Sequence, residues 1–251
     1  MVSVIILGSG NVAQHLIRAF SNADNVAVVQ AYARHPEKLH HLLPEDKITD
    51  NINALAQADV YIISVSDNAI ADVAAALPFK DRLVVHTSGS TGIDVLGTAN
   101  RNGVFYPLQT FSSAKAVHFK EVPLCLETVR AEDMPALKSL AHSVSEKVYH
   151  ITGAQRQALH VAAVFSCNFV NHLYGIGATV CEENNIPFNI LKPLIQETAA
   201  KITTLSPTEA QTGPAVRKDT QTIQRHLDFI KDERLKEIYT LLTQSIQQTH
   251  E

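Results

Sequence analysis

The residues best suited to chemistry lie in the second half of the chain. His160 stands in a long helical stretch that is poor in charge, and Asn168 and Asn171 follow it. An imidazole titrates near neutral pH and can pass a proton to a substrate. Arg217 and Asp219 follow a Gly-Pro pair, and a guanidinium can anchor an anionic group. His160, Asn168 and Arg217 are therefore the candidate catalytic residues, with Asn171 and Asp219 as candidate substrate contacts.

These side chains also have simpler explanations. At about 100° per residue, Asn171 lies within about 20° of His160 on an α-helix, and Asn168 lies about 80° away. A buried His160 could be hydrogen-bonded by Asn171 or by a backbone carbonyl without taking part in chemistry. Arg217 could form an ion pair with Asp219 that only fixes the loop. At the level of sequence both explanations stay open.

An apolar strand runs into a glycine-rich turn at the start of the chain. Residues 2–7 are mostly β-branched, and Gly8-Ser9-Gly10-Asn11-Val12-Ala13 follows, with apolar residues at helical spacing after it. In such a turn the first glycine allows a tight bend, the second lets the backbone approach a pyrophosphate, and the third small residue packs helix on strand. The pattern predicts a dinucleotide site whose contacts include Gly8, Ser9, Gly10, Asn11 and Val12.

The end of the second apolar run, at residues 26–33, indicates which dinucleotide binds. In an NAD site this position carries an acidic residue that holds the ribose 2′-hydroxyl. The chain has Arg34 there instead, followed by His35 and Pro36. A guanidinium suits a 2′-phosphate, so the sequence predicts NADP(H) as the cofactor. The alternative is an NAD-linked protein in which Arg34 is an incidental surface residue.

Polar residues follow two further predicted strands, which end near residues 65 and 88. Ligands in open parallel sheets bind beyond the carboxyl ends of the strands. Asp67 has the alternative of capping a helix, and Ser88 that of forming only turn hydrogen bonds. The expected cofactor contacts are Ser64, Val65, Ser66 and His86, and Ser88 is an expected substrate contact.

Strand and helix patterns alternate as far as Thr152 and only helical patterns follow. The alternation predicts an α/β fold, with a Rossmann-type, doubly wound and mostly parallel sheet over residues 1–152. Helices are expected between the strands at 36–43, 68–77, 93–99 and 134–143. Residues 153–251 are expected to form a smaller all-α domain.

The helix expected over residues 154–184 is apolar on nearly every face. Its centre could be mistaken for a membrane span, but it contains Asn168, Asn171 and His172. Burial by neighbouring helices or by a second subunit is the simpler interpretation. We therefore expect no membrane partner, and a homodimer formed through the helical domain.

Composition fits a globular enzyme. The chain has 251 residues, a hydrophobic content of 45% and a formal net charge of -4, which argues against a nucleic-acid surface. The three cysteines and the scattered histidines show no metal-ligand spacing, and no signal peptide precedes the first strand. A cytoplasmic protein without a metal site is expected.

Six segments together carry a resemblance that spans nearly the whole chain: Gly8–Ala13, Val65–Ile70, His86–Ser90, Tyr106–Ser112, His160–Phe165 and Gly213–Asp219. They are similar to NADP oxidoreductases with a Rossmann-like domain and a helical domain of unknown function. That family resembles pyrroline-5-carboxylate reductases and the 6-phosphogluconate and β-hydroxyacid dehydrogenases, whose helical domains generally dimerise and close over the nicotinamide. The resemblance implies that the all-α domain of residues 153–251 is similar to the C-terminal domain of 6-phosphogluconate dehydrogenase.

The chain departs from these better-known relatives at two points. The β-hydroxyacid dehydrogenases place a catalytic lysine one turn before an asparagine on the first long helix, where this chain has His160 and Asn168 and no lysine. The Ser-Pro-Gly-Gly-Thr-Thr turn of the pyrroline-5-carboxylate reductases is also absent. The resemblance therefore implies a reductase or dehydrogenase without naming its substrate.

Two classes of function remain. The first is an NADP(H)-dependent oxidoreductase acting on a small, anionic C=O or C=N compound, or on the matching hydroxy or amino compound. The second is a non-catalytic NADP(H)-binding redox sensor or dimeric partner module. A pocket beside the nicotinamide lined by His160, Asn168 and Arg217 would favour chemistry, whereas an apolar plug there would favour sensing.

Overall fold

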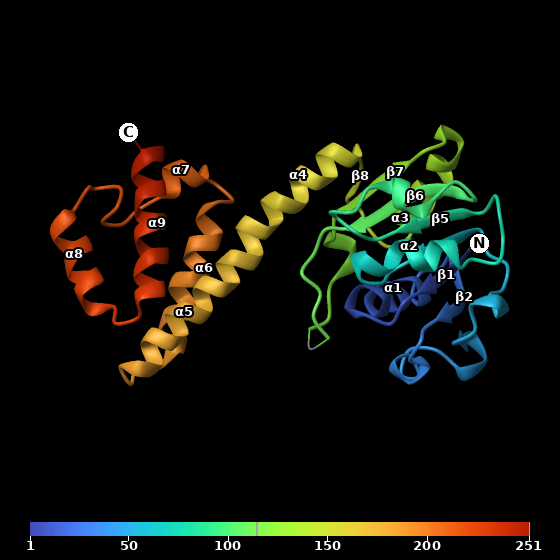
Figure 1. Ribbon diagram of the computed structural model, residues 1–251, viewed down its shortest axis with the longest axis horizontal. Helices are drawn as coiled ribbons and strands as arrows, with labels where there is room; N and C mark the ends of the chain where they lie inside the picture. Colours follow the sequence, from blue (N-terminus) through green and yellow to red (C-terminus); the bar gives the residue numbers. More distant parts are fainter. Residues whose placement is uncertain (114, 251) are drawn as a thin grey trace. The chain divides into compact units, whose positions relative to one another are not determined.

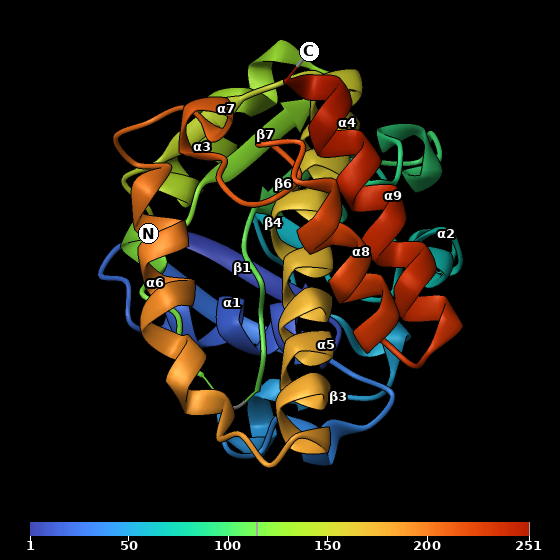
Figure 2. The same cartoon turned by 90° about the vertical axis from the view of Figure 1, so that its left-hand side faces the viewer.

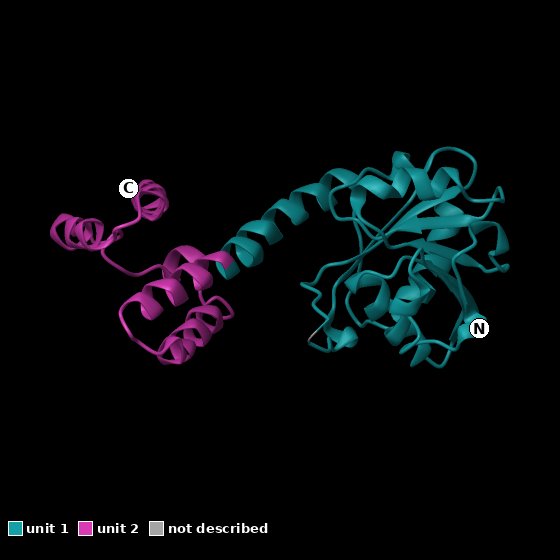
Figure 3. Ribbon diagram, turned by 60° about the horizontal axis from the view of Figure 1, so that its bottom comes forward, with its two compact units in different colours: residues 1–171 teal, residues 172–251 magenta. Residues whose placement is uncertain are grey.

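The computed structural model describes residues 1–113 and 115–250, and the chain divides into two compact units (Figure 3), Met1–Asn171 and His172–Glu251. The division falls inside a continuous helical segment and not after Thr152. The first helix of that segment belongs to the same unit as the sheet, because its side chains bond to loops at the strand ends.

The first unit contains an eight-stranded sheet in the order β3-β2-β1-β4-β5-β6-β7-β8 (Figure 1). Every neighbouring pair is parallel except β6 and β7, which are antiparallel. The predicted Rossmann-type, mostly parallel sheet is confirmed. The strands are β1 (Val2–Leu7), β2 (Val26–Tyr32), β3 (Ile48–Thr49), β4 (Val60–Ile63), β5 (Leu83–His86), β6 (Arg101–Pro107), β7 (Leu124–Thr128) and β8 (Val148–His150).

Strand β1 is buried on both faces, as its unbroken apolar run requires. Successive side chains point to opposite faces, so Val4 and Ile6 pack into one hydrophobic cluster while Ile5 and Leu7 pack into another. Helices α1 (Asn11–Ser21) and α3 (Met134–His142) contribute to the first cluster, and α2 (Ile70–Ala75) to the second. Helices thus cover both faces of the sheet.

Two helices predicted between the strands are shorter than expected. Residues 36–43 contain a single 3₁₀ turn, Pro36–Lys38, and residues 93–99 contain Ile93–Leu96. The second turn ends at Gly97, whose φ of 71° stops helical geometry. Both predictions of full helices were wrong, because a few apolar residues at helical spacing do not determine the length of a helix.

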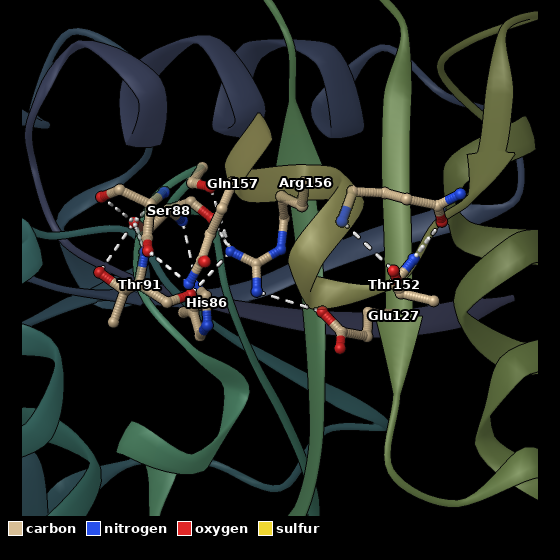
Figure 4. A network of polar contacts seen from close by, with 10 residues as sticks. His86, Ser88, Thr91, Glu127, Thr152, Arg156 and Gln157 are labelled. Carbon is tan, nitrogen blue, oxygen red and sulfur yellow. Dashed lines mark hydrogen bonds and ion pairs between the residues drawn. The ribbon is translucent and has the colours of Figure 1, made fainter. Parts of the chain in front are cut away.

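The buried Arg156 ties α4 (Gly153–Ala163) to the sheet (Figure 4). Its Nη1 donates to the carbonyl oxygens of Ser88, Gly89 and Thr91 at 3.0, 3.3 and 2.7 Å, and its Nη2 lies 3.1 Å from Glu127 Oε2. The side chain has no exposed surface. A charge that deep is tolerated only when it is paired and hydrogen-bonded, so this helix has a defined position against the ends of β5 and β7.

The helix continues through a π-helical turn, Val164–Phe169, into α5 (Val170–Glu183). A π turn contains an extra residue, so positions beyond it are rotated by about 100° relative to an uninterrupted α-helix. Asn171 lies beyond the turn, so its angle from His160 rises from about 20° to about 80°. Asn168 lies within the turn itself. The π turn therefore removes the predicted alignment of Asn171 with His160.

The second unit is built from helices joined by loops (Figure 2), and of its described residues only Cys181 and Ala215 are buried. Pro207 begins a new helix after the cap residue Ser206. Over the described part of the chain, no helix has both the length and the apolar character to cross a membrane. The helices of this unit are the part of α5 from His172 onward, α6 (Lys192–Lys201), α7 (Pro207–Ala210), α8 (Thr220–Phe229) and α9 (Glu233–Thr249).

The glycines of the first turn should respond differently to substitution. Gly8 has a φ of 140°, and a Cβ there would lie 2.0 Å from the carbonyl oxygen of Ser64. Gly8→Ala should lower the free energy of unfolding by about 2–4 kcal/mol, through strain and overpacking. A Cβ on Gly10 would meet nothing within 4 Å, so Gly10→Ala should change stability by less than about 1 kcal/mol. Urea unfolding measures both, and equal losses would contradict the assigned packing.

Candidate functional site

A cavity of about 670 Å³ opens at the carboxyl ends of β1, β2 and β4. The glycine-rich turn forms its floor, and the segments after β2 and β4 form its sides. Each of Gly8, Ser9, Gly10, Asn11, Val12, Arg34, Ser64, Val65 and Ser66 lines it. Nine of the ten predicted cofactor contacts are therefore brought together; the exception is His86.

The turn fits a dinucleotide in its local geometry. Gly8 lies against the Ser64 carbonyl too closely for any side chain, and the space over Gly10 is open. Gly10 caps the N-terminus of α1 without a side-chain hydrogen bond, and the first turn has no acidic residue. The first N–H groups of a helix lack partners within the helix and attract negative charge. These features together suit a pyrophosphate.

Basic side chains line the cavity at the end of β2. Arg34 is joined there by His35 and Lys38. Sequence reasoning identified only Arg34, although Lys38 follows it at helical spacing on the Pro36–Lys38 turn. Three groups able to carry a positive charge suit a phosphate on the 2′-oxygen of the ribose better than a free 2′-hydroxyl.

His86 and Ser88 are buried and do not line this cavity. Burial, and next the positive charge of Arg156, lower the pKa of His86 to about 4, so the ring is neutral near pH 7. The Ser88 N–H donates to His86 Nδ1 at 3.2 Å, and the Ser88 hydroxyl donates to Thr91 Oγ1 at 2.9 Å. Both side chains organise the loop after β5.

Asp67 also belongs to this loop network. Its Oδ2 accepts a 2.6 Å hydrogen bond from the Ser90 hydroxyl. The residue that precedes the 3₁₀ turn Asp67–Ala69 as its cap is Ser66. Asp67 therefore links the ends of β4 and β5, which are neighbours in the sheet.

A second cavity, of about 590 Å³, adjoins the first and contains His160. Tyr106, from the end of β6, lines it as well, and its Oη lies 3.1 Å from His160 Nδ1. Gln109 and Phe111 line both cavities. The two spaces therefore share a wall, and His160 lies on the side of that wall away from the glycine-rich turn.

Asn168 lines the His160 cavity, together with Ser166 and Cys167 of the π turn. Asn171 is not among the lining residues. This agrees with the rotation that the π turn introduces. Among the described residues around this cavity there is no lysine, arginine, aspartate or glutamate, so a substrate anion would need a cation from elsewhere.

Arg217 and Asp219 belong to the second unit. Asp219 caps α8, where its Oδ1 accepts the Thr222 N–H at 3.0 Å, and this hydrogen bond lowers the pKa of the carboxyl. Arg217 is exposed. The helix cap accounts for Asp219 within its unit, and the roles of Arg217 and Asp219 toward a substrate stay predictions.

Sequence reasoning missed Tyr106, Gln109 and Arg156 as parts of the site. Tyr106 lies at the end of β6 and Gln109 follows the strand, at the same sheet edge as the ends of β1, β4 and β5. This position is a signal that could have been used. Arg156 precedes His160 by four residues and so shares its helix face. Nothing in the sequence shows which carbonyl oxygens it binds.

Comparisons with known proteins give matches to two successive parts of the chain. A family model described as "NADP oxidoreductase coenzyme F420-dependent" matches residues 3–89, and one described as "Domain of unknown function (DUF2520)" matches residues 122–246. No curated protein matches the chain. A Bacteroides fragilis protein, described as a putative NADP oxidoreductase, is 38% identical, with 98% of each chain covered and a TM-score of 0.89.

More distant structures share the fold. A Thermotoga maritima protein is 18% identical with a TM-score of 0.75, and 98% of each chain is covered. A pyrroline-5-carboxylate reductase from Coxiella burnetii is 16% identical with a TM-score of 0.58, covering 99% of this chain and 97% of its own. The B. fragilis match is close enough to show kinship over the full length. The chain therefore belongs to the oxidoreductase family that joins a Rossmann domain of the coenzyme F420-dependent NADP oxidoreductase type to a DUF2520 helical domain.

Proposed function

We propose that the protein is an NADP(H)-dependent oxidoreductase that reduces a small, anionic C=O or C=N compound, or oxidises the matching product. The observation that carries the proposal is the shared wall: Gln109 and Phe111 line both the dinucleotide cavity and the cavity that contains His160. A hydride donor in one space and a proton donor in the other would then face one substrate.

The roles follow from the residue types. Bound NADPH supplies a hydride. His160 gives a proton to the oxygen or nitrogen of the substrate as the carbon accepts that hydride. Asn168 orients the substrate, since it lines the same cavity. Arg217 binds an anionic group of the substrate, because a guanidinium pairs with a carboxylate or a phosphate through two parallel hydrogen bonds.

The cavity also bears on the alternative of a redox sensor. An apolar plug beside the nicotinamide would favour a non-catalytic role. A space of about 590 Å³ containing an imidazole and an amide supports chemistry instead. The screen that tests the proposal follows NADPH oxidation with a panel of keto acids, imines and semialdehydes. Tight NADPH binding with no turnover on any of them would favour the sensor.

Cofactor preference should depend on Arg34. We expect NADPH to bind at least about tenfold tighter than NADH, a difference of about 1.4 kcal/mol. Arg34→Ala should remove most of it, and Lys38→Ala should remove a smaller part, because each loses a charge facing the 2′-phosphate. Fluorescence titration measures the affinities.

Arg18→Ala serves as the control, since it removes an exposed positive charge that does not line the cavity. Equal affinities for NADPH and NADH in the unmutated protein would contradict the prediction. Coenzyme F420 is included as a competitor because one matching family model names it. Binding of F420 alone would overturn the assignment of the nucleotide.

Substitutions of His160 and Arg217 should affect different kinetic constants. His160→Ala should lower kcat by about 100-fold or more, and NADPH affinity should change less than about twofold. Arg217→Met should raise KM for anionic substrates and leave neutral analogues nearly unaffected. The neighbouring Lys218→Met is the matched control. Full activity of His160→Ala would remove His160 from the mechanism.

We further propose a homodimer formed through the helical unit. Bulky side chains of this unit are exposed, among them Ile190 at 64%, Leu194 at 63% and Leu241 at 68%. With only two buried residues among its described ones, the unit needs a partner to cover its apolar surface. Light scattering at micromolar concentration should show a dimer, and Leu194→Asp should weaken it. A monomer at all concentrations would contradict the proposal.

A further inference from the structure

Two aromatic side chains from different elements meet at the wall of the His160 cavity. Tyr106 Oη lies 3.1 Å from His160 Nδ1, and the rings are edge-to-face with centroids 6.1 Å apart. Tyr106 is only 8% exposed. His160 therefore has one ring nitrogen engaged by a buried hydroxyl, which leaves Nε2 as the nitrogen available for other partners.

Gly89 packs closely against both His160 and Tyr106. A Cβ on Gly89 would lie 2.6 Å from His160 Nδ1 and 2.6 Å from Tyr106 Cζ. The loop cannot easily retreat, because Arg156 Nη1 donates to the Gly89 carbonyl at 3.3 Å. The spacing of the pair is thus set by a residue without a side chain and by a buried guanidinium.

The hydroxyl of Tyr106 stays protonated over the physiological range. Burial, and next the neighbouring Cys125, raise the pKa of Tyr106 to about 12. A neutral phenol can donate to a neutral imidazole and can accept from a charged one. Other ionisable groups near the pair are Arg156, one turn earlier on α4, Asp67, and Cys167 in the π turn. Arg156 is paired with Glu127.

We propose that Tyr106 is a positioning residue that keeps Nδ1 of His160 hydrogen-bonded in both protonation states, so that proton exchange with the substrate takes place at Nε2. The proposal rests on the proposed role of His160 as proton donor. As hydride adds to the carbon of the C=O or C=N bond, the electron pair of that bond takes the proton from Nε2 of the imidazolium. The neutral ring keeps its Nδ1 proton directed at Tyr106 Oη, and solvent later restores the proton on Nε2.

Tyr106→Phe keeps the ring and removes the hydroxyl. Both forms of His160 then lose a hydrogen bond, and the bond made by the charged ring is the stronger one. The midpoint of the His160 ring titration should therefore move to lower pH by about one unit. The activity of the reduction requires the charged ring and is lost as pH rises, so its descending limb should move to lower pH by the same amount. Near neutral pH, kcat should fall about tenfold, and NADPH affinity should stay within about twofold.

NMR of ring-labelled histidine measures the titration, and His160→Gln identifies the resonance. Tyr149→Phe is the control, because Tyr149 lies on β8, is 50% exposed and lines neither cavity. Gly89→Ala is a second way to break the Tyr106–His160 hydrogen bond, since the added Cβ must push the two side chains apart. The double variant with Tyr106→Phe should be little worse than either single variant, because both break one contact.

An unchanged His160 titration in Tyr106→Phe overturns the inference, and so does a changed titration with unchanged kcat. Failure of the proposed function has a different signature. Full turnover by His160→Gln would remove His160 as the proton donor, whatever the NMR titration shows.

Discussion

The position of helix α4, which carries His160, depends on one buried guanidinium. Arg156 reaches from α4 to three carbonyl oxygens of the loop after β5 and to Glu127 of β7. Buried carbonyl groups need hydrogen-bond donors, and a buried cation needs a partner of opposite charge. The guanidinium supplies donors to the carbonyl oxygens, and Glu127 supplies the negative charge that the guanidinium needs. Because His160 lies one turn further along the same helix, this contact also determines where the imidazole meets Tyr106.

The same helix α1 that offers its N-terminus to a phosphate also holds the wall between the two cavities. Asn11 Nδ2 donates to the Phe111 carbonyl at 3.2 Å, and the rings of His15 and Phe111 are 5.0 Å apart. Phe111 and Gln109 therefore stand over the glycine-rich turn by direct contact with its helix. A displacement of α1 would disturb the cofactor cavity and its border with the His160 cavity together.

Local patterns predicted the parts of the site that depend on backbone conformation. The strand, the glycine-rich turn and α1 follow one another in the chain, so the spacing of Gly8, Gly10 and Ala13 alone implies their geometry. The same holds for Arg34 at the end of β2. The π turn could not be predicted this way, because a periodicity of 3.6 residues assumes a regular α-helix and does not reveal an inserted residue. Extrapolation of a regular α-helix therefore aligned Asn171 with His160, while the structure has Asn168 in the His160 cavity.

The sequence by itself determined the fold class, the place of the dinucleotide turn and the candidate proton donor. The alternation of strand and helix patterns indicates the first, the glycine motif the second, and an imidazole on a helix poor in charge the third. Tertiary structure decided which candidates come together. His86 and Ser88 end a strand at the expected edge, yet they are buried and support a loop. Tyr106 and Arg156 acquire their roles only from groups 54 and 65 to 68 residues away along the chain. Such contacts arise when the sheet brings its strand ends to one edge, and no local pattern encodes them.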